Sequence, residues 1–173
     1  QLRGLSTSQV QTLTAEEFAQ FQPRAVSGLT APQLGALLPE KLQEFGAEQM
    51  ALFNSAQVVR LSTLQLNALT PEALQGLQTA ALSALRPATL QALTPEQLAS
   101  LKPEQVRALT TSQLGGLGTD TLNALTAQQF GEFSSAQLRS LSTRQVSALE
   151  LDDLAALNSA DMRALSSLQL GPL

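Results

Sequence analysis

The sequence predicts an all-α solenoid, a superhelical spiral of 21 eight-residue repeats in which each repeat forms one short N-capped helix with its leucines inside. Three observations predict this fold class. Apolar residues recur at two fixed positions of an eight-residue period, helix-capping residues recur at the first position, and proline recurs at the second.

The eight-residue period runs without an insertion. A partial repeat covers residues 1–5, and 21 units follow from residue 6 to residue 173. Thr94-Pro-Glu-Gln-Leu-Ala-Ser-Leu101 is a representative unit. The fifth position is always Leu, Val, Phe or Met, and the eighth is Leu except for four phenylalanines: Phe21, Phe45, Phe53 and Phe133. We therefore expect residues 1–173 to form a single repeat array.

Other regular structures do not fit this period. In one continuous helix, eight residues advance roughly 800°, so the apolar stripe drifts by about 80° per unit and forms no lasting face. Six prolines at position two would also break such a helix: Pro23, Pro39, Pro71, Pro87, Pro95 and Pro103. A strand would point positions five and eight to opposite faces of a sheet.

Short helices explain the polar positions as well. Position one is Ser or Thr in eleven units, as N-caps require, and proline at position two is tolerated as the first helical residue. Position four is Gln in twelve units, which completes a capping box. We expect the side-chain caps to lapse where position one is unsuited to capping: Gln22, Leu38, Gln78, Arg86, Lys102 and Glu150.

Neither end carries an atypical capping unit, since Gln1 falls inside a repeat and Leu173 ends one. We therefore expect a segment of a longer array, or ends that neighbouring coils cover. The irregular outer positions disfavour a designed repeat protein. The handedness of the spiral and the number of repeats per turn are not encoded in any single unit.

The composition leaves little room for catalysis or metal binding. The chain has no Cys, His, Trp or Tyr, and its only lysines are Lys41 and Lys102. No histidine base or thiol nucleophile is available, so we expect no enzyme, no catalytic residues, no cofactor and no metal. A net charge of −4 with scattered basic residues argues against nucleic acid as a partner. No apolar stretch approaches the roughly 20 residues that insert across a membrane.

Three groups of residues are candidate sites, and each has a simpler structural explanation. Asp152, Asp153 and Asp161 suggest a calcium site, but they fill first-turn positions where acids suit a helix N-terminus, and the glycine-containing Asp-rich loop is absent. Glu16 and Glu17 diverge by about 100° on a helix and form no carboxylate pair. The Phe18/Phe21 and Phe130/Phe133 pairs occupy the two core positions, so we expect them to fill the core.

The recurring phrase Leu-Thr-x-x-Gln-Leu-x-Ala-Leu, seen in variant forms at Leu93–Leu101 and Leu125–Phe133, resembles tandem arrays of very large bacterial surface or secreted proteins of the adhesin-like or haemagglutinin-like kind. The resemblance covers the whole chain. It implies an extracellular stalk that holds a binding tip away from the cell, and it carries over no functional residue.

The sequence therefore favours a structural segment, an elongated stalk, spacer or filament-forming element of a bacterial extracellular or cell-surface protein. Uncapped repeats also predict end-to-end self-association. The alternative is a protein-binding scaffold that uses the variable outer positions, although these are mostly small or uncharged and lack aromatic anchors. No specific protein partner is predicted.

Overall fold

The structure is a computed structural model, and it describes residues 2–14, 16–17, 20–21 and 23–171. These residues form twenty short α-helices after one 3₁₀ turn, and they contain no strand, as expected for an α-solenoid. The elements are η1 (Leu2–Gly4), α1 (Thr7–Thr12), α3 (Pro23–Val26), α4 (Ala31–Gly35), α5 (Pro39–Leu42), α6 (Ala47–Met50), α7 (Ser55–Val58), α8 (Thr63–Ala68), α9 (Pro71–Gly76), α10 (Thr79–Ser83), α11 (Pro87–Leu90), α12 (Pro95–Ala99), α13 (Pro103–Arg107), α14 (Thr111–Gly115), α15 (Thr119–Leu122), α16 (Ala127–Phe130), α17 (Ser135–Ser140), α18 (Thr143–Ser147), α19 (Leu151–Ala156), α20 (Ser159–Ala164) and α21 (Ser167–Leu170).

Each repeat bends because two consecutive residues leave the helical conformation. Position eight is extended at the end of several helices, as at Leu69 with φ −68° and ψ 140°. Position one of the next unit is extended again, as at Thr70 with φ −70° and ψ 156°. No described residue has a positive φ. The chain therefore turns between helices through ordinary extended backbone, without glycine in the left-handed region.

The predicted N-caps are present. At Thr94 the hydroxyl accepts a hydrogen bond from the Gln97 N–H at 3.2 Å, and Gln97 Oε1 accepts one from the Thr94 N–H at 3.0 Å. The pKa of Glu96 in the same first turn is lowered, first because its carboxylate accepts a hydrogen bond from its own backbone N–H and second because of the Thr94 hydroxyl. The predicted lapses are confirmed at Leu38, Gln78, Arg86, Lys102 and Glu150, whereas Gln22 lies outside the described residues.

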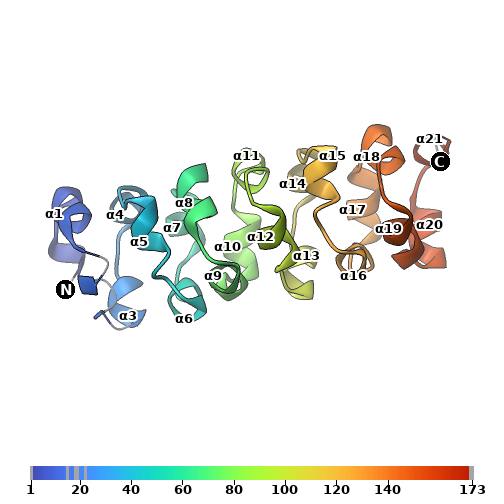
Figure 1. Ribbon diagram of the computed structural model, residues 1–173. Helices are drawn as coiled ribbons and strands as arrows, with labels where there is room; N and C mark the ends of the chain where they lie inside the picture. The colour runs from blue at the N-terminus through green and yellow to red at the C-terminus, as the bar shows by residue number, and fades with distance from the viewer. Residues whose placement is uncertain (1, 15, 18–19, 22, 172–173) are drawn as a thin grey trace.

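Successive helices wind into an elongated superhelix. Each helix packs mainly against the helix three units further on, as in the pairs α6–α9 and α16–α19. In Figure 1, α1, α4, α8, α11 and α18 lie along one edge of the array, α3, α6, α9, α13 and α16 lie along the opposite edge, and the two termini lie at opposite ends. One coil of the solenoid therefore contains between three and four repeats.

The two apolar positions of each repeat form one continuous core. From Val26 to Val146 every side chain at position five is at most 1% exposed, and from Leu29 to Leu149 every side chain at position eight is at most 8% exposed. Phe130 and Phe133 pack together inside this core with ring centroids 5.1 Å apart. Their predicted core-filling role is confirmed, and Phe21 packs partly buried against the same core.

A ladder of buried glutamines joins each coil to the one before it. Gln97 is 2% exposed, and its Nε2 donates to the carbonyl oxygens of Leu66 at 3.1 Å and Leu69 at 2.7 Å. Twenty-eight residues, the separation of Gln97 and Leu69, correspond to three and a half repeats. Ten position-four glutamines donate to the carbonyl 28 residues earlier: Gln33, Gln57, Gln65, Gln97, Gln105, Gln113, Gln129, Gln137, Gln145 and Gln169.

A second set of contacts joins coils at their surface. Some position-six side chains contact the position-seven residue that lies 25 residues later in the chain. The Gln75 amide, for example, donates to the Ser100 carbonyl oxygen at 2.9 Å. The Arg107–Glu132 ion pair has the same separation. These contacts are more exposed than the glutamine ladder, so we expect them to contribute less to stability.

We expect Gln105→Glu to destabilise the fold by about 3 kcal/mol at neutral pH, because a buried carboxylate would face two carbonyl oxygens without a donor. Gln105 is 1% exposed, and its Nε2 lies 2.8 Å and 2.9 Å from the carbonyl oxygens of Leu74 and Leu77. Urea unfolding measures the effect. Gln9→Glu is the matched control, since the exposed Gln9 amide only caps its own helix through the Ser6 N–H. Equal effects at the two positions would contradict the ladder.

Among the described glycines, Gly76, the last residue of α9, leaves the least room for a Cβ atom. A Cβ atom added at Gly76 would lie 2.2 Å from the carbonyl oxygen of Ala47 and 2.5 Å from its Cα. Both atoms belong to backbone, which cannot rotate away. Glycine at this position therefore allows α6 and α9 to pack in direct contact.

We expect Gly76→Ala to destabilise the protein by about 1–3 kcal/mol through overpacking, although alanine favours a helix more than glycine does. Gly115→Ala provides the control, because an added Cβ there lies 3.5 Å from the Ser140 carbonyl oxygen, an ordinary contact. That variant should be neutral or stabilised by up to about 1 kcal/mol. Thermal unfolding of both variants tests the prediction, which fails if Gly76→Ala is as stable as the parent.

Candidate functional site

The acidic residues considered for calcium binding do not share a site. Asp152 is exposed, whereas Asp153 and Asp161 are 5% and 7% exposed at position four of consecutive repeats. Asp153 accepts a hydrogen bond from the Glu150 N–H at 3.3 Å, and Asp161 accepts one from the Asn158 N–H at 3.0 Å. In the part of the chain that the structure describes, no group of three or more acidic side chains is placed to hold a metal ion. The buried pair therefore acts in helix capping.

Asp153 occupies the ladder position without a ladder donor. By the register of the neighbouring repeats, its carboxyl faces the turn at Leu122 and Leu125, 31 and 28 residues earlier. Desolvation by burial raises the pKa of Asp153, and the nearby carboxylates of Glu150 and Asp152 raise it further against the hydrogen bond from the Glu150 N–H. The coil contact at α19 is therefore weakest when this group is ionised.

Glu16 and Glu17 are not arranged as a catalytic pair of carboxylates. Glu17 accepts a hydrogen bond from the Thr14 N–H at 2.7 Å, and the Thr14 hydroxyl accepts one from the Glu17 N–H at 3.1 Å. Glu16 is exposed beside it. This reciprocal capping agrees with the expected first-turn role. Phe18, the remaining candidate of that repeat, lies outside the described residues.

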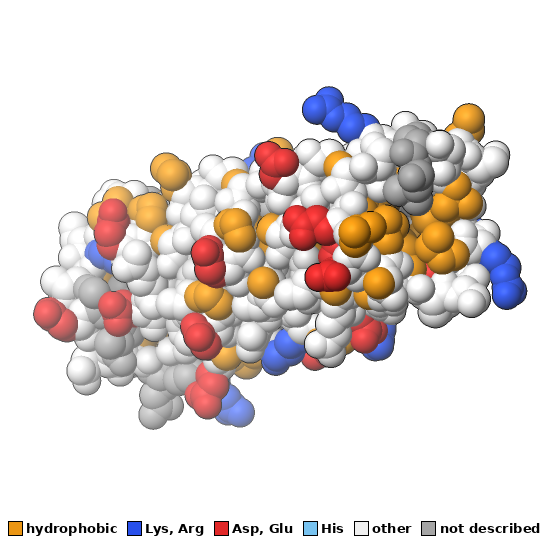
Figure 2. All heavy atoms as spheres, turned by 45° about the vertical axis from the view of Figure 1, so that its right-hand side comes forward, with side chains coloured by type: hydrophobic (Ala, Val, Ile, Leu, Met, Phe, Trp, Pro, Cys, Tyr) orange, Lys and Arg blue, Asp and Glu red, His pale blue; other side chains and the backbone are white. Residues whose placement is uncertain are grey.

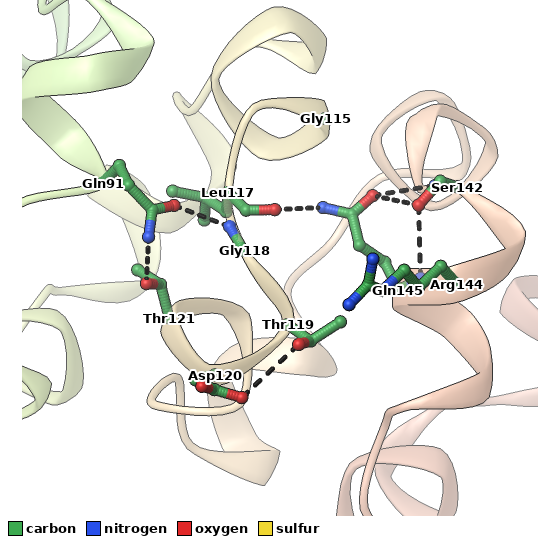
Figure 3. Close-up of a pocket in the computed structure, with 10 residues that line it drawn as sticks. All are labelled: Gln91, Gly115, Leu117, Gly118, Thr119, Asp120, Thr121, Ser142, Arg144 and Gln145. Atoms are coloured by element: carbon green, nitrogen blue, oxygen red, sulfur yellow. Dashed lines mark hydrogen bonds between the residues drawn. The ribbon is translucent and has the colours of Figure 1, made fainter.

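The best candidate for a binding site is a hollow of about 420 Å³ beside α15 and α18. It forms at the repeat that begins at Gly118, where two positions depart from the common pattern. Gly118 has no side chain to cap the helix, and Thr121 stands where most repeats have Gln. Gly115, from the preceding repeat, lines the hollow without a side chain. The missing side chains leave the space open (Figure 3).

Gln91 from the preceding coil takes the place of the missing position-four glutamine at the Gly118 N–H. Its Oε1 accepts a hydrogen bond from the Gly118 N–H at 2.6 Å, and its Nε2 donates to the Thr121 hydroxyl oxygen at 2.5 Å. Figure 3 shows Gln91 reaching across to the backbone at Gly118 and to Thr121, and Arg144 pointing toward Thr119 from the other side. The hollow is thus held in shape by three successive coils.

Sequence reasoning did not identify this hollow. The signal was present, because the repeat Gly118–Leu125 lacks both its cap side chain and its glutamine. What the sequence could not show is that Gln91, 27 residues earlier, meets Gly118 in space.

The remaining surface has few charged side chains, and they are dispersed. On the face shown in Figure 2, acidic and basic side chains are dispersed, and backbone together with side chains that are neither charged nor hydrophobic covers most of the area. Hydrophobic side chains gather toward the C-terminal end of the array on this face. No described helix exceeds six residues, about 9 Å of rise, so none could cross a bilayer.

Comparison with known families gives a match for part of this array. Residues 95–127 match the ALTTAQ repeat. Within that segment, Ala108–Gln113 reads Ala-Leu-Thr-Thr-Ser-Gln, which differs from the repeat's name at one residue. The ALTTAQ-matched segment includes α12 to α15 and one wall of the hollow. No curated protein matches the chain. The match supports a repeat family for this sequence, and it does not by itself indicate what the repeats bind.

We expect Asp153→Gln, which restores the ladder donor, to stabilise the protein at neutral pH by about 1 kcal/mol per hydrogen bond gained. The pKa of Asp153 is raised in the folded state. The parent therefore loses stability as the pH rises from the pKa of the unfolded state to that of the folded state, and it keeps the full contribution below the unfolded-state pKa. The advantage of the variant should therefore shrink as the pH falls toward 4. Urea unfolding of both proteins between pH 7 and pH 4 measures it, and a pH-independent difference would contradict this account.

Proposed function

We propose that this chain is a structural repeat segment that serves as an elongated stalk or spacer rather than as a catalyst. The observation that carries the proposal is the single core extending from Val26 to Val146, bonded from coil to coil by the glutamine ladder. Each coil uses its buried polar groups to hold the next coil. The resulting rod gains length with every added repeat and keeps one cross-section.

The mechanics of such a rod follow from its contacts. Bending opens the coil–coil contacts on one side, where buried Nε2 donors would lose their carbonyl acceptors without water replacing them. Leaving a buried polar group without a partner costs about 1–3 kcal/mol. Local unfolding of a single repeat exposes core on both neighbours. The ladder therefore favours a stiff spacer over a flexible linker.

We place this spacer in an extracellular or cell-surface bacterial protein of the adhesin-like kind. Support comes from the resemblance of the repeated phrase to arrays in such proteins. Outward positions are mostly small or uncharged, which suits a stalk that must not adhere along its length.

Stacking of further coils on the described array is the interaction that its contacts fit. Met162 is 36% exposed, whereas the position-five side chains from Val26 to Val146 are covered by the following coil. The surface around Met162 repeats the geometry on which an internal coil packs. It therefore accepts another coil of the same repeat, from the same chain or from a second copy, and the latter would build filaments.

A protein-binding scaffold is the alternative function. Three leucines at outward positions favour it, because a pure spacer needs no exposed apolar side chains there: Leu64 is 70% exposed, Leu151 84% and Leu168 77%. They lie on three separate repeats, and none of them is an aromatic or arginine anchor. Capture of one stoichiometric partner that Leu64→Gln or Leu151→Gln abolishes would establish the scaffold over the spacer.

A tandem fusion tests the spacer directly. If the segment 6–173 is fused after Leu173, so that the eight-residue register is kept, the particle should double in length at constant width. Negative-stain micrographs and X-ray scattering measure both dimensions. A control fusion with two extra glycines at the junction breaks the register and should produce a joint between two rods. Compact particles would refute the spacer, and open-ended fibres would show that copies assemble end to end.

A further inference from the structure

The hollow beside α15 and α18 carries two opposite charges that do not neutralise each other. Asp120 and Arg144 both line it, and both side chains are exposed. Among the described residues the one ion pair joins Arg107 to Glu132, so the Asp120 carboxylate and the Arg144 guanidinium lie more than 4.0 Å apart. The hollow that both side chains line has a volume of about 420 Å³.

The Thr119 hydroxyl lies between the two charges, and the Thr121 hydroxyl lies beside Gln91 (Figure 3). The Thr119 hydroxyl donates to Asp120 Oδ1 at 3.4 Å, a long hydrogen bond, and the Arg144 guanidinium points toward Thr119 from the opposite wall (Figure 3). The Thr121 hydroxyl oxygen already accepts from Gln91 and can still donate. The walls thus offer an anionic acceptor, a planar cationic donor and two hydroxyls within one recess.

We propose that this hollow binds a small zwitterion of the α-amino acid class. The ligand carboxylate accepts two hydrogen bonds from the Arg144 guanidinium, whose fork matches carboxylate geometry. The ligand ammonium group donates to Asp120 and to the threonine oxygens. A volume of about 420 Å³ accommodates an amino acid with a short side chain resting on Leu117.

The charge pattern selects this class over simpler ligands. A lone anion that reaches Arg144 approaches the Asp120 carboxylate, and a lone cation that reaches Asp120 approaches the Arg144 guanidinium. A zwitterion satisfies both charges at once. A saccharide generally packs a ring against an aromatic side chain, and none lines this hollow. Because both protein charges are exposed, we expect a dissociation constant near 1 mM, about −4 kcal/mol.

Chemical-shift titration of the ¹⁵N-labelled chain tests the proposal with L-serine as the probe. The backbone amides of Gly118, Thr119 and Arg144 should shift and saturate, whereas amides of α4 to α7 should not move. Acetate, methylammonium and glucose, each at matched ionic strength, should bind at least about tenfold more weakly. Equal binding of glucose would indicate a saccharide site, and equal binding of acetate an anion site. Either result, or no saturable shift up to about 50 mM serine, overturns the proposal.

Paired variants separate the charges from the fold. Asp120→Asn and Arg144→Gln should each weaken serine binding about threefold to fivefold, as expected for exposed ion pairs. Asp152→Asn and Arg139→Gln are the controls, since these exposed residues lie outside the hollow, and they should leave binding unchanged. Well-dispersed spectra confirm folding of each variant, and undiminished binding by the Asp120→Asn/Arg144→Gln double variant would refute the site.

Discussion

The fold depends on the side-chain amide of the position-four glutamine, which lies between successive coils. A helix of four to six residues leaves most of its backbone N–H and C=O groups without intrahelical partners. The position-four glutamine bonds both kinds of group at once, because its Oε1 accepts from the N-cap of its own helix and its Nε2 donates to the end of a helix in the preceding coil. For Gln113 these bonds measure 2.8 Å to the Thr110 N–H and 2.8 Å to the Leu85 carbonyl oxygen. Leucines supply the driving force for burial, and the amide makes burial of such short helices feasible.

This double role fixes the repeat length and restricts what can replace glutamine. An insertion of one residue would move the amide away from the carbonyls 28 and 31 residues earlier, and no insertion occurs between residues 6 and 173. Lys41 replaces only the donor function of the glutamine, since its Nζ donates to the Gln11 carbonyl oxygen. The helix that Lys41 belongs to has no side-chain cap at Leu38. Asp153 preserves only the acceptor half. The ladder thus tolerates partial substitutes at isolated repeats, where neighbouring rungs hold the register.

The structure of the single repeat could be predicted from the sequence, whereas the contacts between coils and the number of repeats per coil could not. The period, the caps at residues such as Thr94 and the burial of positions five and eight follow from local rules of helix capping and apolar spacing. The sequence analysis did not predict the second hydrogen bond of the glutamine, which its Nε2 donates to the preceding coil. A capping box accepts Glu as readily as Gln, yet position four has twelve glutamines and the single glutamate Glu17. This preference indicates that position four requires a hydrogen-bond donor. The number of repeats per coil depends on small rotations at two extended residues, which no residue type specifies.

The position of the candidate site follows from the same constraint. In a regular repeat the cap, the glutamine and the two apolar residues are all engaged in holding neighbours, so only outward side chains remain for any ligand. At Gly118 and Thr121 the chain omits two of these groups, and Gln91 from the earlier coil maintains the backbone contact in their place. Gln91 thereby stabilises this repeat from the preceding coil, and the surface of the repeat itself becomes available to a ligand. In a solenoid of this kind, specific recognition is therefore best sought where a repeat departs from its pattern and a neighbouring coil supplies part of its bonding.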